Sequence, residues 1–132
     1  MSIELKMLIF SVFLLLIQLV MQVVAGIIQN GLANTVSARD EHEDTSGYAA
    51  RFERAFYNML ETFPVFVALV LIVQVTESWT VMTALGAQLY FWGRIFYLPA
   101  YIAGIPFVRT FIWVASVAGM VIMAWPLLAQ VT

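Results

Sequence analysis

Cysteine is absent from the 132-residue chain, and charged side chains are scarce. Without cysteine the chain has no disulfide, no thiolate metal ligand and no cysteine nucleophile. Asp, Glu, Lys and Arg together make up 11% of the residues, and the net charge is −2. Since no basic tract lies outside the apolar segments, the composition argues against nucleic-acid binding.

Hydrophobic residues are abundant instead, at 63% of the sequence. One small soluble core could not cover so much apolar surface, so a bilayer is the natural solvent. A hydrocarbon layer about 30 Å thick takes roughly 20 mostly apolar residues per helix. Four such stretches occur, at 7–29, 51–76, 79–103 and 107–130. The sequence therefore predicts an all-α integral membrane protein, a single transmembrane domain (1–132) built as a four-helix up-and-down bundle.

The segment 31–50 is polar and contains the charged run RDEHED at 39–44. Acidic and histidine side chains can bind metals, but adjacent residues of a loop do not converge on one ion. We interpret this segment as a solvated loop between the first two helices, and we expect no metal site.

The distribution of basic residues predicts the orientation in the membrane. The other two connections are short, so successive helices are antiparallel and the first and third loops share one side. The other side has only Lys6. The side of the first and third loops carries four arginines: Arg39, Arg51, Arg54 and Arg109. Because positive loops stay inside, we expect these loops in the cytoplasm and both termini on the opposite side. Trp79 and Trp125 then lie at the headgroup level of that opposite side.

A polar stripe follows the second predicted helix. Arg51, Arg54, Asn58 and Glu61 are spaced by 3, 4 and 3 residues, which places them on one helical face. A charge facing lipid costs on the order of 3 kcal/mol, so the stripe should face protein or a water-filled cavity. Arg51 alone could instead extend to the headgroups, but that interpretation leaves Glu61 unexplained.

The third predicted helix carries a matching face with Arg94, Tyr97 and Tyr101. Glu61 and Arg94 each lie about ten residues from the same end of the bundle, roughly 15 Å deep, so we expect them to pair. Such a pair could simply hold helices together. The remaining positive charge on this half of the bundle suggests an anionic ligand.

Small residues also recur on the third and fourth helices, as Gly86, Gly93, Ala115 and Gly119. Small side chains let helix backbones approach closely in lipid, so we predict close packing there.

These motifs resemble one known family. The run Arg51-x-x-Arg54-Ala55-x-x-Asn58-x-x-Glu61-x-x-Pro64, then Arg94-x-x-Tyr97-x-x-x-Tyr101, then IPFVR ending at Arg109, is similar to the MAPEG family, the membrane-associated proteins in eicosanoid and glutathione metabolism. The resemblance spans roughly residues 50–112. It implies a homotrimer that binds glutathione as co-substrate between protomers near the cytoplasmic face, in a cleft open to small hydrophobic substrates dissolved in the membrane lipid.

The resemblance also implies roles for single residues. Arg51, Arg54, Asn58 and Glu61 would hold the tripeptide, and helix three of a neighbouring protomer would contribute Arg94, Tyr97 and Tyr101. Arg109 matches the arginine proposed to stabilise the glutathione thiolate in family enzymes. The chemistry is coherent, since a thiol with a pKa near 8.5 becomes a better nucleophile at neutral pH beside a permanent positive charge. Alternatively, Arg109 is an anchor to lipid phosphate.

The chain departs from the family pattern in two places. The end of helix one offers Gln29 and Asn30 where eicosanoid enzymes usually have arginine, so Arg39 could replace that contact, and Thr62 stands where some members have tyrosine. These departures argue against an eicosanoid-specific synthase. The small, loop-poor form of the chain looks more like the bacterial members, which implies a bacterial inner membrane.

Two functions remain open on this reasoning. The first is a glutathione-dependent transferase or peroxidase that acts on hydrophobic electrophiles or lipid hydroperoxides. The second is a non-catalytic membrane protein of the same fold, whose polar cleft binds a lipid headgroup or a protein partner.

Overall fold

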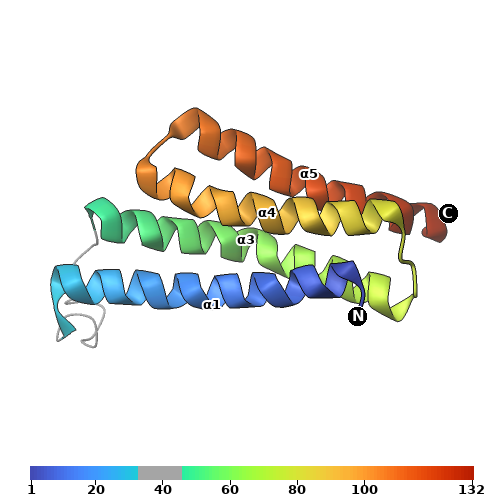
Figure 1. The fold of residues 1–132 in the computed structure, drawn as a ribbon, viewed down its shortest axis with the longest axis horizontal. Coiled ribbons are helices and arrows are strands. Elements are labelled where there is room, and N and C mark those ends of the chain that lie inside the picture. The colour runs from blue at the N-terminus through green and yellow to red at the C-terminus, as the bar shows by residue number, and fades with distance from the viewer. Residues whose placement is uncertain (33–45) are drawn as a thin grey trace.

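The computed structural model describes residues 1–32 and 46–132, which form long antiparallel helices. In chain order they are α1 (Ile3–Asn30), α3 (Gly47–Val75), α4 (Val81–Ala103) and α5 (Pro106–Val131). Both termini lie at one end of the bundle, here called the terminal end (Figure 1). The opposite end, where α3 begins and α4 joins α5, is called the loop end. The predicted four-helix bundle is confirmed.

The helix boundaries differ from the prediction mainly at two N-termini. α1 begins at Ile3 rather than at 7, with the Ser2 hydroxyl accepting a hydrogen bond from the Leu5 amide as an N-cap. α3 begins at Gly47 rather than at 51, so Arg51 and Arg54 lie inside a helix instead of at its edge. Arg39 and the charged run 39–44 lie outside the described residues.

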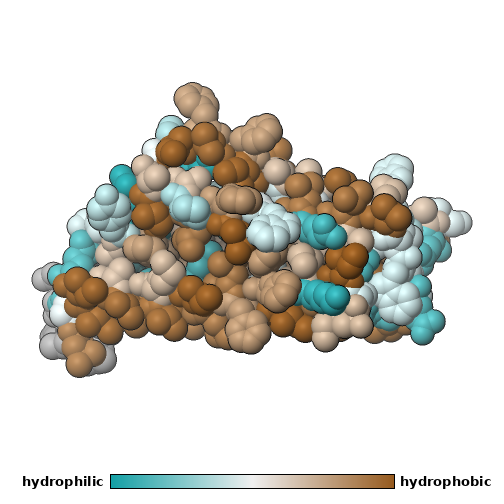
Figure 2. Space-filling model, viewed as in Figure 1, coloured by the Kyte–Doolittle hydropathy of each residue, from teal (hydrophilic) through white to brown (hydrophobic). Residues whose placement is uncertain are grey.

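Three helices, α1, α3 and α5, are long and apolar enough to cross a membrane. The remaining helix, α4, carries Thr83, Gln88 and Arg94 and packs against α1, α3 and α5 within the bundle. Apolar side chains cover most of the visible face, and hydrophilic ones lie at the two ends and in a few places between them (Figure 2). This distribution is that of a protein surrounded by hydrocarbon.

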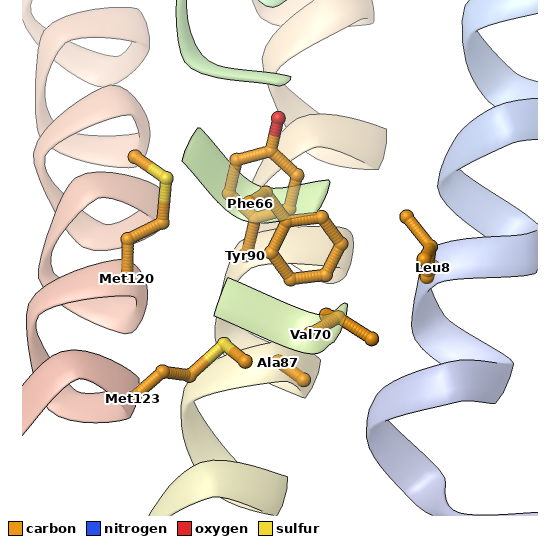
Figure 3. Packing of buried hydrophobic residues seen from close by; sticks show 7 residues of the cluster. All are labelled: Leu8, Phe66, Val70, Ala87, Tyr90, Met120 and Met123. Carbon is orange, nitrogen blue, oxygen red and sulfur yellow. The ribbon is translucent and has the colours of Figure 1, made fainter. Parts of the chain in front are cut away.

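The apolar core lies in the middle of the bundle and draws on all four helices (Figure 3). Phe66 of α3 stacks on Tyr90 of α4 with the ring centroids 4.0 Å apart. Leu8 packs from α1, and Met120 and Met123 pack from α5. The Tyr90 hydroxyl is satisfied by Thr62 at 3.0 Å, so the buried ring brings no unpaired polar atom into the core.

Close packing of small residues joins α4 to α5, as predicted. A Cβ atom added at Gly119 would lie 2.6 Å from the carbonyl oxygen of Gly86 and 2.9 Å from the amide nitrogen of Tyr90. One added at Gly93 would lie 3.0 Å from Cβ of Ser116. The two backbones therefore approach too closely at Gly119 for any side chain.

The terminal end is closed by side-chain hydrogen bonds. Gln74 Oε1 accepts from the Ser2 hydroxyl at 2.8 Å and from the Trp79 indole nitrogen. The Thr83 hydroxyl donates to the buried carboxylate of Glu4 and also completes a capping box with Thr80. These bonds fix the register of α1 against α3 and α4.

Candidate functional site

The polar residues of the predicted site gather at the loop end, beginning with Arg51. Its Nη1 donates to the carbonyl oxygen of Ile102 at 2.8 Å, and its guanidinium carbon lies 5.5 Å from the ring centre of Tyr48. The last carbonyls of a helix lack intrahelical partners, and α4 ends at Ala103. Arg51 therefore caps α4 from the neighbouring helix α3.

Tyr101 links three helices at this end. Its hydroxyl accepts a hydrogen bond of 3.0 Å from Nε of Arg54 on α3. Its ring lies 4.9 Å below the guanidinium carbon of Arg109 on α5, within cation–π range. The ring of Tyr97, one turn earlier on α4, lies 5.6 Å away. The structure thus brings four of the predicted site residues together around one aromatic pair.

Arg94 is fully buried and lies on α4, one turn before Tyr97. Its Nη2 donates to Oδ1 of Asn58 at 2.9 Å, and its guanidinium carbon lies 4.5 Å from the ring centre of Tyr97. Nε and Nη1 are buried without a hydrogen-bond partner in the described part of the chain. A buried guanidinium with open donors is costly, so its environment must supply further acceptors.

Glu61 makes no direct ion pair with Arg94 in the described part of the single chain, although the two charges are near enough to interact electrostatically. Its side chain is exposed on the outer face of α3, and it makes no hydrogen bond or ion pair with a described residue. Arg94 donates to Asn58, and the direct Glu61–Arg94 contact is not formed within the protomer, because Arg94 points into the bundle and Glu61 points out of it. Pairing across a protomer interface, or through a shared ligand, stays a prediction.

A small pocket of about 180 Å³ opens beside the cluster. Its walls come from α3, α4 and α5: Asn58, Tyr97, Arg109, Thr110 and Trp113. Ligand sites are typically about 300–1,000 Å³, so this pocket can take one polar end of a ligand but not a whole tripeptide. Asn58 and Arg109 face the same space, which places an amide and a permanent positive charge around one bound group.

Two pocket residues were not predicted from the sequence. Thr110 and Trp113 follow Arg109 on the first turns of α5. The signal was available for Trp113, because residues four apart share a helical face. Gln29, a suggested substitute for the missing helix-one arginine, is already used by the fold: its amide bonds the Ser46 carbonyl at 2.8 Å and the Ser46 amide at 3.0 Å.

The implied contribution of Arg94, Tyr97 and Tyr101 from a neighbouring protomer stays a prediction. Within the chain, Tyr101 contacts Arg54 of α3 and Arg109 of α5, whereas Tyr97 contacts Arg94 and Tyr101 of its own helix α4. Within residues 1–32 and 46–132 no three His, Cys, Asp or Glu side chains are placed to hold a metal ion. The site is therefore dominated by arginine and aromatic groups.

Comparison with known families decides the assignment. The sequence model of the MAPEG family matches residues 7–129. The chain belongs to the MAPEG family. This MAPEG protein shares with its family a membrane-spanning helical bundle, and the family includes glutathione transferases and peroxidases. No curated protein and no solved structure gives a significant match to the chain.

Proposed function

We propose that this MAPEG protein binds glutathione at the loop end and presents its sulfur, as a thiolate, to hydrophobic electrophiles or lipid hydroperoxides. The observation that carries the proposal is the pocket shared by Asn58, Tyr97 and Arg109. Arg109 keeps its charge at any pH of interest, and a guanidinium against a thiol favours the ionised sulfur.

The chemistry of glutathione matches the other polar residues. The tripeptide has two carboxylates, for which arginine is the preferred partner, and Arg51 and Arg54 lie on the same helix as Asn58. Its ammonium group suits the free carboxylate of Glu61. The described pocket would then take the cysteinyl part, beside Arg109, while the charged ends extend along α3.

We further propose that the protein is a homotrimer. Glu61 and Arg54 are both exposed on α3 of the single chain, and a charge facing lipid at such a depth is unfavourable. A neighbouring protomer packed on this face would cover the stripe and enlarge the small pocket. Glutathione would then lie between protomers, with the Tyr97–Tyr101 side of the site already present in each chain.

Substrates would enter from the bilayer. At the start of α5, beside Arg109, Phe107 is 89% exposed and Phe111 is 76% exposed. These side chains would lie in lipid, so an apolar molecule could reach the pocket without passing through water. With the loop end in the cytoplasm, as the arginine distribution favours, glutathione would enter from the aqueous side of a bacterial inner membrane.

The two reactions differ in the bond that the sulfur breaks. In the transferase reaction the thiolate attacks an electrophilic carbon, a carbon–sulfur bond forms, and the leaving group departs with its electron pair. In the peroxidase reaction the thiolate attacks a peroxide oxygen and the O–O bond breaks. That step gives an alcohol, after protonation, and a sulfenic acid. A second glutathione then reduces the sulfenic acid, giving glutathione disulfide and water.

Thermal unfolding in detergent tests the proposal, because a ligand that binds only the folded state stabilises it by about 2.7 kcal/mol at 100 times Kd. We expect glutathione to raise the unfolding midpoint, and S-methylglutathione, which has no ionisable thiol, to raise it less. Turnover of a generic aryl halide or of cumene hydroperoxide should follow. Protection without turnover would favour the non-catalytic binding protein, and the absence of protection by glutathione would refute the proposal.

A further inference from the structure

Gln18 is a buried polar residue on α1, a helix that supplies none of the site residues. Its side chain is only 2% exposed, and Oε1 has no hydrogen-bond partner among the described residues. Buried polar side chains are nearly always hydrogen-bonded, so an open acceptor in the apolar interior requires an explanation.

The complementary open groups belong to Arg94. This side chain is 0% exposed, its Nη2 is engaged by Asn58, and its Nε and Nη1 have no partner in residues 1–32 and 46–132. A guanidinium does not lose its proton in a protein, so these donors cannot be removed by a change of protonation. The interior therefore holds open donors on α4 and an open acceptor on α1.

The helix register places these groups in one layer. At the two ends of α1, Ser2 bonds Gln74 and Gln29 bonds Ser46, so α1 runs antiparallel to α3 and Gln18 lies opposite Asn58. The Phe10 and Phe91 rings are 5.6 Å apart, and Thr83 donates to Glu4, which places Gln18 three to five residues, roughly 4.5–7.5 Å, along the axis from Arg94. The long Arg94 side chain reaches Asn58, and hence reaches the level of Gln18.

We propose that a buried water binds between Gln18 and Arg94, and that Gln18 thereby acts as a positioning residue for Asn58. A water molecule can accept from the guanidinium and donate to Gln18 Oε1, which satisfies both side chains, and buried waters typically make about three such bonds. With Arg94 held in this way, its bond to Oδ1 fixes the Asn58 amide. The Nδ2 group of Asn58 is then free to donate into the pocket.

The direction in which Gln18→Leu shifts the unfolding midpoint distinguishes a water-linked Gln18 from one whose Oε1 has no partner. If Oε1 were unpaired, Gln18→Leu would remove an unsatisfied polar atom and raise the unfolding midpoint. If a water joins Gln18 Oε1 to Arg94, Gln18→Leu leaves buried hydrogen-bond donors without an acceptor and lowers the unfolding midpoint. Gln18→Glu adds a charge that can neutralise Arg94, so its midpoint should lie above that of Gln18→Leu.

The matched control is Ser11→Ala. Ser11 is also fully buried on α1, its hydroxyl has no partner in the described part of the chain, and it lies about two turns from Gln18. Its midpoint should be unchanged or raised. A double-mutant cycle of Gln18→Leu with Arg94→Met should show coupling, with the second substitution losing less than it does alone. If Gln18→Leu is as stable as the parent, and Gln18→Glu is the least stable variant, Gln18 and Arg94 are not linked and the inference is wrong.

The positioning role rests on the proposed function and is tested separately. Gln18→Leu should weaken glutathione binding roughly 2- to 12-fold, the worth of one hydrogen bond, with kcat nearly unchanged, and Gln18→Glu should restore most of the affinity. Equal affinity in the parent and Gln18→Leu would refute the positioning role. If the parent itself does not bind glutathione, the proposed function fails, whereas the unfolding midpoints still decide the link between Gln18 and Arg94.

Discussion

Replacing Arg109 by alanine should reduce turnover far more than glutathione affinity. The guanidinium lines the pocket of about 180 Å³ and would contact a sulfur atom there at roughly 4 Å. Two unit charges at that distance interact by about 4 kcal/mol at an effective dielectric of about 20. Arg109 is half-buried, so solvent screening reduces this value. The remaining interaction, roughly 2–3 kcal/mol, corresponds to about a 30- to 160-fold loss in kcat.

The pH dependence of the reaction identifies the cause of that loss. Without the positive charge, the pKa of the bound thiol should rise toward its free value of about 8.5, so that less thiolate is present at neutral pH. The loss of rate should then be largest near neutral pH and shrink above the thiol pKa. Ultraviolet absorbance of the thiolate in the glutathione complex measures the pKa directly.

Two variants complete the experiment. Arg109→Lys keeps a charge without the planar fork and should retain part of the activity. Tyr101→Phe removes the hydrogen bond to Arg54 but keeps the ring below Arg109, so it should alter affinity more than turnover. If Arg109→Ala leaves turnover and the thiol pKa unchanged, Arg109 is a headgroup anchor at the start of α5 and the mechanism is refuted.

The other predictions concern packing, assembly, binding and orientation. Gly119→Ala should lower the free energy of unfolding by about 1–3 kcal/mol, because the added Cβ meets backbone atoms of α4. Gly26→Ala, with open space around it, should raise that free energy by about 0.5–1 kcal/mol. Chemical denaturation in detergent compares the two variants, and equal effects would contradict the predicted contact. Glu61→Gln should weaken both the trimer and glutathione binding, and native mass measurement of a parent protein that is only monomeric would contradict the assembly. Arg54→Ala should raise KM for glutathione at least tenfold with little change in kcat, and a fall in kcat alone would show that its role is different. A reporter fused to the C-terminus should lie outside the cytoplasm, and a cytoplasmic signal would reverse the proposed orientation.

The bundle followed from the sequence because length and apolarity nearly determine helices in a bilayer. The packing of Gly119 against α4 could be predicted as well, since the absence of a side chain is itself the signal. The start of α3 could not, because residues 47–50 (Gly, Tyr, Ala, Ala) closely follow the charged run 39–44 and begin with a glycine, and the helix begins there all the same.

For the site, helical spacing correctly brought Arg54, Asn58, Tyr97, Tyr101 and Arg109 to one end of the bundle. Depth alone could not identify the partner of Arg94. Asn58 and Glu61 differ by less than one turn in depth, and the direction in which each points around the α3 axis decides that Asn58 faces the interior. Gln18 could not be predicted as a site residue, because a single glutamine in an apolar helix forms no pattern with its neighbours.

The contact between Arg51 and the Ile102 carbonyl has a consequence for mutagenesis of this protein. A side chain that closes the end of another helix contributes to folding whether or not a ligand is present. Arg51→Ala will therefore lower the yield of folded protein as well as any measured affinity. An alanine scan of the arginines would rank Arg51 among the functional residues for the wrong reason, unless each rate is divided by the amount of correctly folded enzyme. Arg54 and Arg109 also contact another helix, through the Tyr101 side chain of α4, so their variants need the same correction.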